Sequence, residues 1–114
     1  YTPTVLTDVR ADMPLMREEI FGPVAVVTPF DEVDEVVAWA NDSRYGLAAS
    51  VWTEGLSNGH RIAAQLEAGT VWINKHGGIH PMVPFGGIKG SGYGMEFGFE
   101  GLKSVAVPVV ITSR

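Results

Sequence analysis

The sequence contains no cysteine, which excludes a disulfide framework, a thiolate nucleophile and a thiolate metal ligand within this chain. Basic residues are also scarce, because eight Lys and Arg stand against thirteen Asp and Glu, a formal charge of −5. Phosphate backbones and anionic lipid surfaces are bound by clustered cations. We therefore expect neither nucleic acid nor a membrane as a partner.

Long apolar runs are absent as well. The longest, Val105–Ile111, is interrupted by Pro108 and is far shorter than the ~18 residues of a membrane-spanning helix. The first residues show neither the basic region nor the apolar segment of a signal peptide, which favours a cytoplasmic location. Hydrophobic residues nevertheless make up 46% of the 114 residues, so the composition is that of one folded domain rather than of a disordered chain.

Up to Asn74 the sequence alternates between strand and helix patterns. Apolar, β-branched runs typical of buried strands occupy residues 24–28, 47–52 and 70–73. Between them, apolar residues recur with helical spacing after Asp31 and Ser57, two candidate N-caps. Gly69 stands where a left-handed residue commonly follows a helix. This order predicts an α/β fold built on a parallel βαβαβ unit.

After Asn74 the sequence is rich in glycine, with nine of the fourteen glycines between Gly77 and Gly101. The pattern predicts a Gly-rich C-terminal extension with an extended segment at residues 82–85 and a short helix or turn at residues 95–102. A terminal strand is expected over residues 104–112, with a free edge or bulge at its proline. Such a strand, with no obvious partner in its own chain, could add to the sheet of another subunit.

Two patterns in this extension resemble ligand-binding motifs, one for a metal and one for a phosphate, but neither has the features that such a site requires. His76 and His80 have the spacing of metal ligands on a helix, yet Gly77-Gly78 between them disfavours a helix, and no metal site is predicted. The stretch Gly86–Gly94 matches neither of the common phosphate-binding glycine patterns. A system of close-packed loops is the better interpretation.

The segment Glu18–Pro23, with sequence Glu-Glu-Ile-Phe-Gly-Pro, carries the most chemistry. A carboxylate held before a buried strand could accept hydrogen bonds from both hydroxyls of a ribose, and Phe21 could flank a planar ring. The alternative is that both glutamates are solvated surface charges and Phe21 is a core residue. Spacing alone favours neither.

This segment and several others resemble the C-terminal part of NAD(P)-dependent aldehyde dehydrogenases. The similarity covers nearly the whole chain, through the motifs at residues 3–6, 18–23, 41–43, 45–52, 66–74 and 84–92. It implies that residues 1–103 form the C-terminal part of a catalytic domain and that residues 104–114 form an oligomerisation strand. The usual Tyr-Thr after Glu-Gly-Leu is replaced here by Lys103–Val110. A homo-oligomer is expected.

The resemblance also implies roles for individual residues. Glu19 would bind the nicotinamide-ribose hydroxyls and Phe21 would lie beside the nicotinamide of NAD or NADP. Phe85 would line the aldehyde pocket, the preceding loop, residues 75–83, would help to set substrate preference, and Ile79 would face the same pocket. In this family a cysteine thiolate attacks the aldehyde, and a glutamate-activated water releases the acid.

No residue of this chain can supply that cysteine, so no catalytic residue is assigned and the isolated chain is expected to be inactive. The first interpretation is therefore a C-terminal fragment of an aldehyde dehydrogenase that contributes cofactor and substrate contacts. The alternative is a free-standing structural or interaction module that pairs through its sheet edges.

Overall fold

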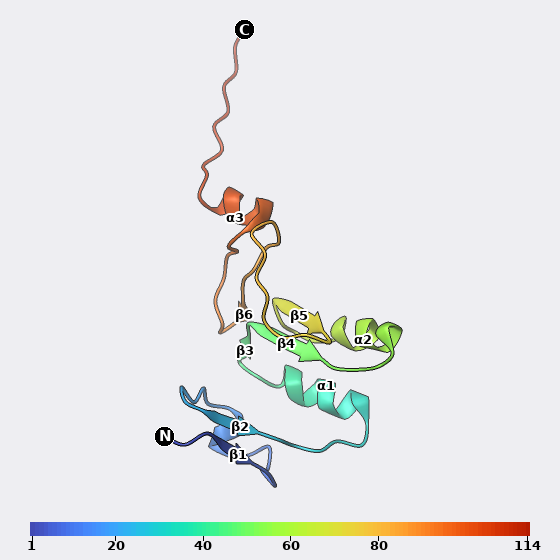
Figure 1. The fold of residues 1–114 in the computed structure, drawn as a ribbon. Coiled ribbons are helices and arrows are strands. Elements are labelled where there is room, and N and C mark those ends of the chain that lie inside the picture. The colour runs from blue at the N-terminus through green and yellow to red at the C-terminus, as the bar shows by residue number, and fades with distance from the viewer. The chain divides into compact units, whose positions relative to one another are not determined.

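The computed structural model describes all residues from Tyr1 to Arg114, in two compact units, Tyr1–Arg44 and Tyr45–Arg114. The first unit contains β1 (Thr4–Leu6), the 3-10 helix η1 (Pro14–Met16), β2 (Val24–Val26) and α1 (Val33–Asn41). The second contains β3 (Tyr45–Gly46), β4 (Ala48–Val51), α2 (Leu56–Ala63), β5 (Thr70–Ile73), β6 (Ile88–Lys89) and α3 (Gly98–Ser104). Figure 1 shows these elements.

In the first unit, β1 and β2 form a parallel two-stranded sheet with Thr4 opposite Val24. Parallel pairing requires a long connection, which here contains η1. The α1 helix follows, and its Val37 is buried. Its N-cap is Glu32 rather than the predicted Asp31, and no side chain caps the helix.

In the second unit, β4, α2 and β5 form a parallel strand–helix–strand unit, with the four pairs running from Ala48–Thr70 to Val51–Ile73. This confirms the second half of the predicted βαβαβ arrangement. In the first half the elements are those predicted, but the hydrogen-bonded partner of β2 is β1. Three residues, Thr4–Leu6, are too few to produce a recognisable periodic pattern, so the sequence did not predict that strand.

The α2 helix packs closely against β5 because it carries a glycine in its middle. Gly59 is buried, and a Cβ atom at this position would lie 2.9 Å from Cγ2 of Ile73. The absent side chain thus allows the close approach, although glycine weakens a helix interior by about 1 kcal/mol relative to alanine. The predicted N-cap, Ser57, is wrong, since Gly55 occupies that position and the helix begins at Leu56.

Gly69 has a packing role instead of the predicted left-handed one. Its φ angle is not positive, and a Cβ atom here would lie only 1.7 Å from the carbonyl oxygen of Gly86. The backbone N–H of Gly69 also donates to the carbonyl of Gly46, at 3.1 Å. The loop that contains Gly69, the loop that contains Gly86 and β3 therefore meet at Gly69, where a side chain would not fit.

We predict that Gly69→Ala lowers the free energy of unfolding of the chain by at least about 2 kcal/mol, because the new methyl group must displace the Gly86 backbone. Urea titration followed by tryptophan fluorescence measures this change. Gly22→Ala is the control, since no atom lies within 4 Å of a Cβ there and its φ is not positive. Equal losses in both variants would contradict the packing role.

The short helix predicted near residues 95–102 is confirmed as α3. Ser104 still belongs to α3, which corrects the predicted start of the terminal strand, and the residues after it are extended without a paired strand in this chain, so pairing with another subunit stays a prediction. The apolar side chains of this tail are 79–89% exposed at Val105, Val107, Val109, Val110 and Ile111. Extended backbone becomes a strand only beside a partner, and this chain provides none (Figure 1).

The buried core is small. Val37, Val51 and Trp72 are its only buried hydrophobic residues, whereas large apolar side chains are exposed on both units. Extended apolar surface of this kind is uncommon on monomeric proteins and favours association. No helix of the structure combines the length and the apolar character needed to cross a bilayer.

Candidate functional site

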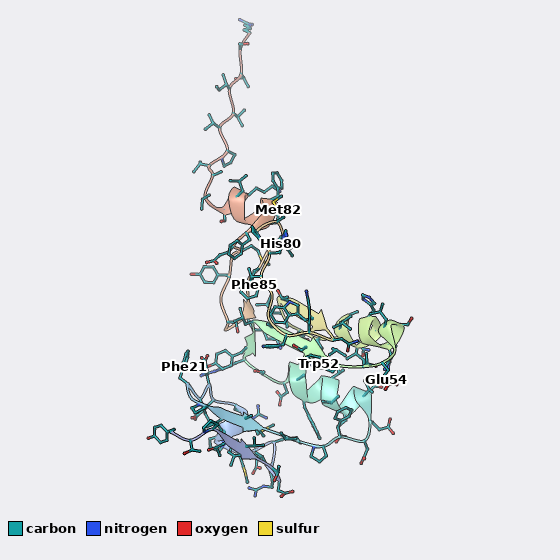
Figure 2. All side chains as sticks on the ribbon, viewed as in Figure 1. Phe21, Trp52, Glu54, His80, Met82 and Phe85 are labelled. Carbon is teal, nitrogen blue, oxygen red and sulfur yellow. The ribbon has the colours of Figure 1, made fainter.

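The loop between η1 and β2 presents Glu19 and Phe21 to solvent. The N–H of Gly22 donates to the carbonyl of Ile20 at 2.9 Å, and the N–H of Val24 donates to the carbonyl of Gly22 at 2.8 Å. These tight turns bring the chain into β2. Phe21 is 96% exposed and stands away from β2 (Figure 2), so the alternative that it is a core residue of this structure is wrong. The Glu19 carboxylate is exposed and forms no ion pair.

In the second unit, Asn74 fixes the start of the loop that follows β5. It has a left-handed backbone, φ 54°, a conformation that asparagine tolerates better than most residues. Its side-chain oxygen accepts the N–H of Thr53 at 2.8 Å, and its side-chain nitrogen donates to the carbonyl of Thr53 at 2.8 Å. This amide therefore ties the end of β5 to the segment that leaves β4.

His76 provides a second anchor for the same loop. Its Nδ1 lies 2.6 Å from Oγ of Ser50 on β4, and its ring meets the ring of Trp72 edge-on, with centroids 5.2 Å apart. The hydroxyl and the indole thus hold the imidazole against the sheet. Lys75 lies between the two anchored residues.

His80 is oriented by the turn that it begins. The N–H of Met82 donates to His80 Nδ1 at 3.1 Å, and the N–H of Val83 donates to the carbonyl of His80 at 2.9 Å. His76 and His80 thus use their Nδ1 atoms for separate structural contacts. No group of three or more potential metal ligands gathers in the chain.

The loop, α2 and β5 border a cavity of about 410 Å³ that is open to solvent. Ile79 and Phe85 both line it, together with Lys75, His60 and His80, and no carboxylate lines it. Phe85 is half-buried and Ile79 is 56% exposed. Figure 2 shows His80, Met82 and Phe85 along the loop. The structure therefore brings the two predicted pocket residues to one cavity of ligand size.

Phe85 is held at the far end of the loop by an isolated bridge. Its N–H donates to the carbonyl of Glu96 at 2.9 Å, and the N–H of Glu96 donates to the carbonyl of Phe85 at 2.8 Å. The predicted close packing of the glycine-rich stretch holds for part of it: the N–H of Gly46 donates to Oγ of Ser91 at 2.9 Å, whereas no atom lies within 4 Å of a Cβ position at Gly92 or Gly94. Both ends of the cavity loop are thus fixed.

Sequence reasoning missed two residues that hold the loop of this cavity, Asn74 and Ser50. Asn74 carried a usable signal, because an asparagine between a strand and a glycine-rich loop is a common left-handed residue. Ser50 carried none, since a lone serine in an apolar run does not reveal its partner. Lys75 was included only within the loop, and its position depends on both anchors.

Comparison with known proteins identifies the family. A sequence profile of the aldehyde dehydrogenase family matches residues 1–109. An aldehyde dehydrogenase of Enchytraeus buchholzi is 50% identical over 102 residues, which are 90% of this chain and 20% of that protein. A betaine aldehyde dehydrogenase of Brucella anthropi is 52% identical over 100 residues, 88% of this chain and 20% of that protein. The chain belongs to the aldehyde dehydrogenase family.

Solved structures agree with this assignment. The betaine aldehyde dehydrogenase of Staphylococcus aureus in complex with NAD+ superposes with a TM-score of 0.85 at 43% identity, covering 90% of this chain and 20% of that one. The NAD+ complex of a Bacillus cereus aldehyde dehydrogenase gives the same TM-score at 55% identity, covering 88% of this chain and 20% of that one. The chain thus spans about a fifth of the length of these relatives, and its predicted α/β fold is confirmed.

Proposed function

We propose that the chain supplies cofactor and substrate contacts to an aldehyde dehydrogenase that oxidises an aldehyde to a carboxylic acid with NAD or NADP. The observation that carries this proposal is a cavity lined by both Ile79 and Phe85 in a chain whose residues 1–109 match the family. These two side chains would form part of the wall against which the aldehyde binds.

Glu19 and Phe21 fit the cofactor role chemically. A free carboxylate can accept hydrogen bonds from two adjacent ribose hydroxyls, and an exposed phenyl ring can lie against a flat heterocycle. The nicotinamide, when bound, supplies the hydride acceptor. In this proposal Glu19 orients the ribose and Phe21 limits where the ring can lie, so both act by positioning.

The remaining assignments follow from the same family membership. Residues 1–103 would belong to the catalytic domain and residues 104–114 would form an oligomerisation strand in a cytoplasmic homo-oligomer. The exposed apolar tail supports the second assignment, because side chains of this kind gain stability when a neighbouring subunit covers them.

The alternative function, a module that pairs through its sheet edges, is favoured by one observation. Each of the three sheets has only two strands, so each strand has one edge without a strand partner. Exposed edges are templates for pairing with another chain. This alternative assigns no role to the free Glu19 carboxylate, which the dehydrogenase proposal uses.

The test is a comparison of two proteins. In the first, the chimera, the segment of the Brucella anthropi enzyme that matches this chain is replaced by the corresponding residues of the chain. The second is the purified 114-residue chain. We expect NAD+-dependent oxidation of butanal by the chimera and none by the chain, which contains no cysteine. Turnover by the chain, or a folded chimera without activity, would contradict the proposal.

A further inference from the structure

The side chains that line the cavity have an unusual charge balance for an acidic protein. One amine, Lys75, and two imidazoles, His60 and His80, line it, and no carboxylate does. The chain as a whole carries five more acidic than basic residues. A ligand in this cavity therefore meets positive charge and hydrogen-bond donors, although the rest of the chain is predominantly negative.

The backbone position of Lys75 is determined by its neighbours. Asn74 is bonded through its side chain to both backbone polar groups of Thr53, and His76 is bonded to Ser50. The peptide backbone is thus fixed on both sides of the lysine. Its ammonium also lies 3.9 Å from the Cβ position of Gly78, so it lies over a part of the loop that has no side chains.

No carboxylate of the second unit neutralises this ammonium. The ion pairs there join Lys89 to Glu67 and Lys103 to Glu100. Between Glu67 and Glu96 the sequence contains no acidic residue. The positive charge of Lys75 is therefore available to a ligand.

His80 adds a directed donor at the same cavity. Because its Nδ1 accepts the N–H of Met82, the neutral imidazole carries its proton on Nε2. Nε2 is then a hydrogen-bond donor, suited to a carbonyl or carboxylate oxygen. A quaternary ammonium group offers no acceptor to this donor.

We propose that the aldehyde oxidised at this site carries an anionic group, a carboxylate at the end remote from the aldehyde, which pairs with Lys75. The inference rests on the proposed function and specifies its substrate class. Related betaine aldehyde dehydrogenases are named for a substrate with a quaternary ammonium, a cation that proteins bind with aromatic rings and negative charge. Lys75 would repel that cation, and no carboxylate of the cavity compensates.

The experiment measures kcat/KM of the chimera for succinic semialdehyde, butanal and betaine aldehyde, which carry a negative, a zero and a positive charge. We expect succinic semialdehyde to be preferred over betaine aldehyde. Lys75→Gln should reduce kcat/KM for succinic semialdehyde about 10- to 100-fold, since a hydrogen bond to a charged group contributes about 1.5–3 kcal/mol. The loss should be a rise in KM, while butanal changes less than about twofold.

Lys103→Gln is the matched control, because it removes the same charge from α3, where Lys103 pairs with Glu100 and does not line the cavity. It should leave the ratio of the substrates unchanged. A second protein, in which only residues 75–85 are transferred into the Brucella enzyme, repeats the test with the rest of the relative's fold retained. It should show the same shift away from betaine aldehyde.

The outcomes separate the two proposals. Oxidation of butanal combined with an unchanged preference for betaine aldehyde, or with a Lys75→Gln variant indistinguishable from its parent, would overturn the anionic-substrate inference and leave the dehydrogenase function standing. A folded chimera that oxidises none of the three aldehydes would overturn the proposed function itself. The substrate preference is measured both in the chimera and in the protein that receives only residues 75–85. A folding defect in one of them therefore still leaves a test of the inference in the other.

Discussion

Replacing Glu19 by glutamine in the chimera should lower kcat/KM for NAD+-dependent oxidation about 10- to 100-fold. The carboxylate is exposed and unpaired in this structure, so its hydrogen-bonding capacity is available for two ribose hydroxyls. An amide can accept at only one of its two terminal atoms, and a hydrogen bond involving a charge contributes about 1.5–3 kcal/mol. Steady-state and single-turnover rates of NADH formation measure the loss.

The adjacent Glu18 provides the control for this prediction. Glu18→Gln removes the same charge one residue away, and the backbone N–H of Glu18 keeps its 2.8 Å bond to the carbonyl of Pro14. We expect the rate of this variant to stay within about twofold of the parent. If both substitutions slow NADH formation equally, the effect is one of overall charge, and the assignment of Glu19 to the ribose is wrong. No change in either variant would favour the edge-pairing module.

The second large effect concerns the apolar tail. We predict that the 114-residue chain forms a dimer or larger species, and that the double substitution Val107→Asp/Val109→Asp raises its dissociation constant at least about 100-fold. The two valines alternate with Pro108 along an extended segment, so they share one face, and both are about four-fifths exposed. Burial of each valine contributes at least about 1.5 kcal/mol, and about 3 kcal/mol corresponds to a factor of 100 or more.

Light scattering over a range of concentrations, combined with sedimentation, measures this dissociation constant. Thr112→Asp/Ser113→Asp is the control, because it adds the same two charges to the same exposed tail and removes no apolar side chain. A monomeric parent at high concentration, or equal dissociation in the two double variants, would contradict an association through residues 104–114.

The elements that could be predicted from sequence are those with a local signal. The α1 helix repeats valine at helical spacing, and β4 and β5 are short apolar runs bounded by turn residues, so all three were found. The pairing of β2 with β1 could not be predicted for two reasons. A strand of three residues is too short to show an alternating pattern, and the partner of a strand is determined by contacts between residues that are distant in sequence. The predicted N-caps failed for a related reason, since neither helix has a side-chain cap that a sequence motif could reveal.

The residues of the candidate site also fall into those with a local sequence signal and those whose partners are distant in sequence. Glu19, Phe21 and Phe85 belong to motifs that can be recognised in one short window, although their roles remain predictions. The anchors of the cavity loop join residues 21 and 26 positions apart, Thr53 to Asn74 and Ser50 to His76. Gly69 illustrates the limit most clearly, because its sequence position is typical of a helix end, whereas its actual constraint is the Gly86 backbone.

The loop between β5 and β6 is fixed at its two ends, and the residues between those ends differ in the substitutions that they tolerate. Asn74 and His76 fix one end, and the Phe85–Glu96 bridge fixes the other. Between them, Gly77 and Gly78 have φ angles of 67° and 135°, a left-handed backbone in which a side chain is strained, whereas Ile79 has an ordinary backbone and is more than half exposed. Substitutions can therefore accumulate at Ile79 but not at the two glycines, which would allow descendants of this chain to diversify the molecules they accept while the surrounding fold is inherited unchanged.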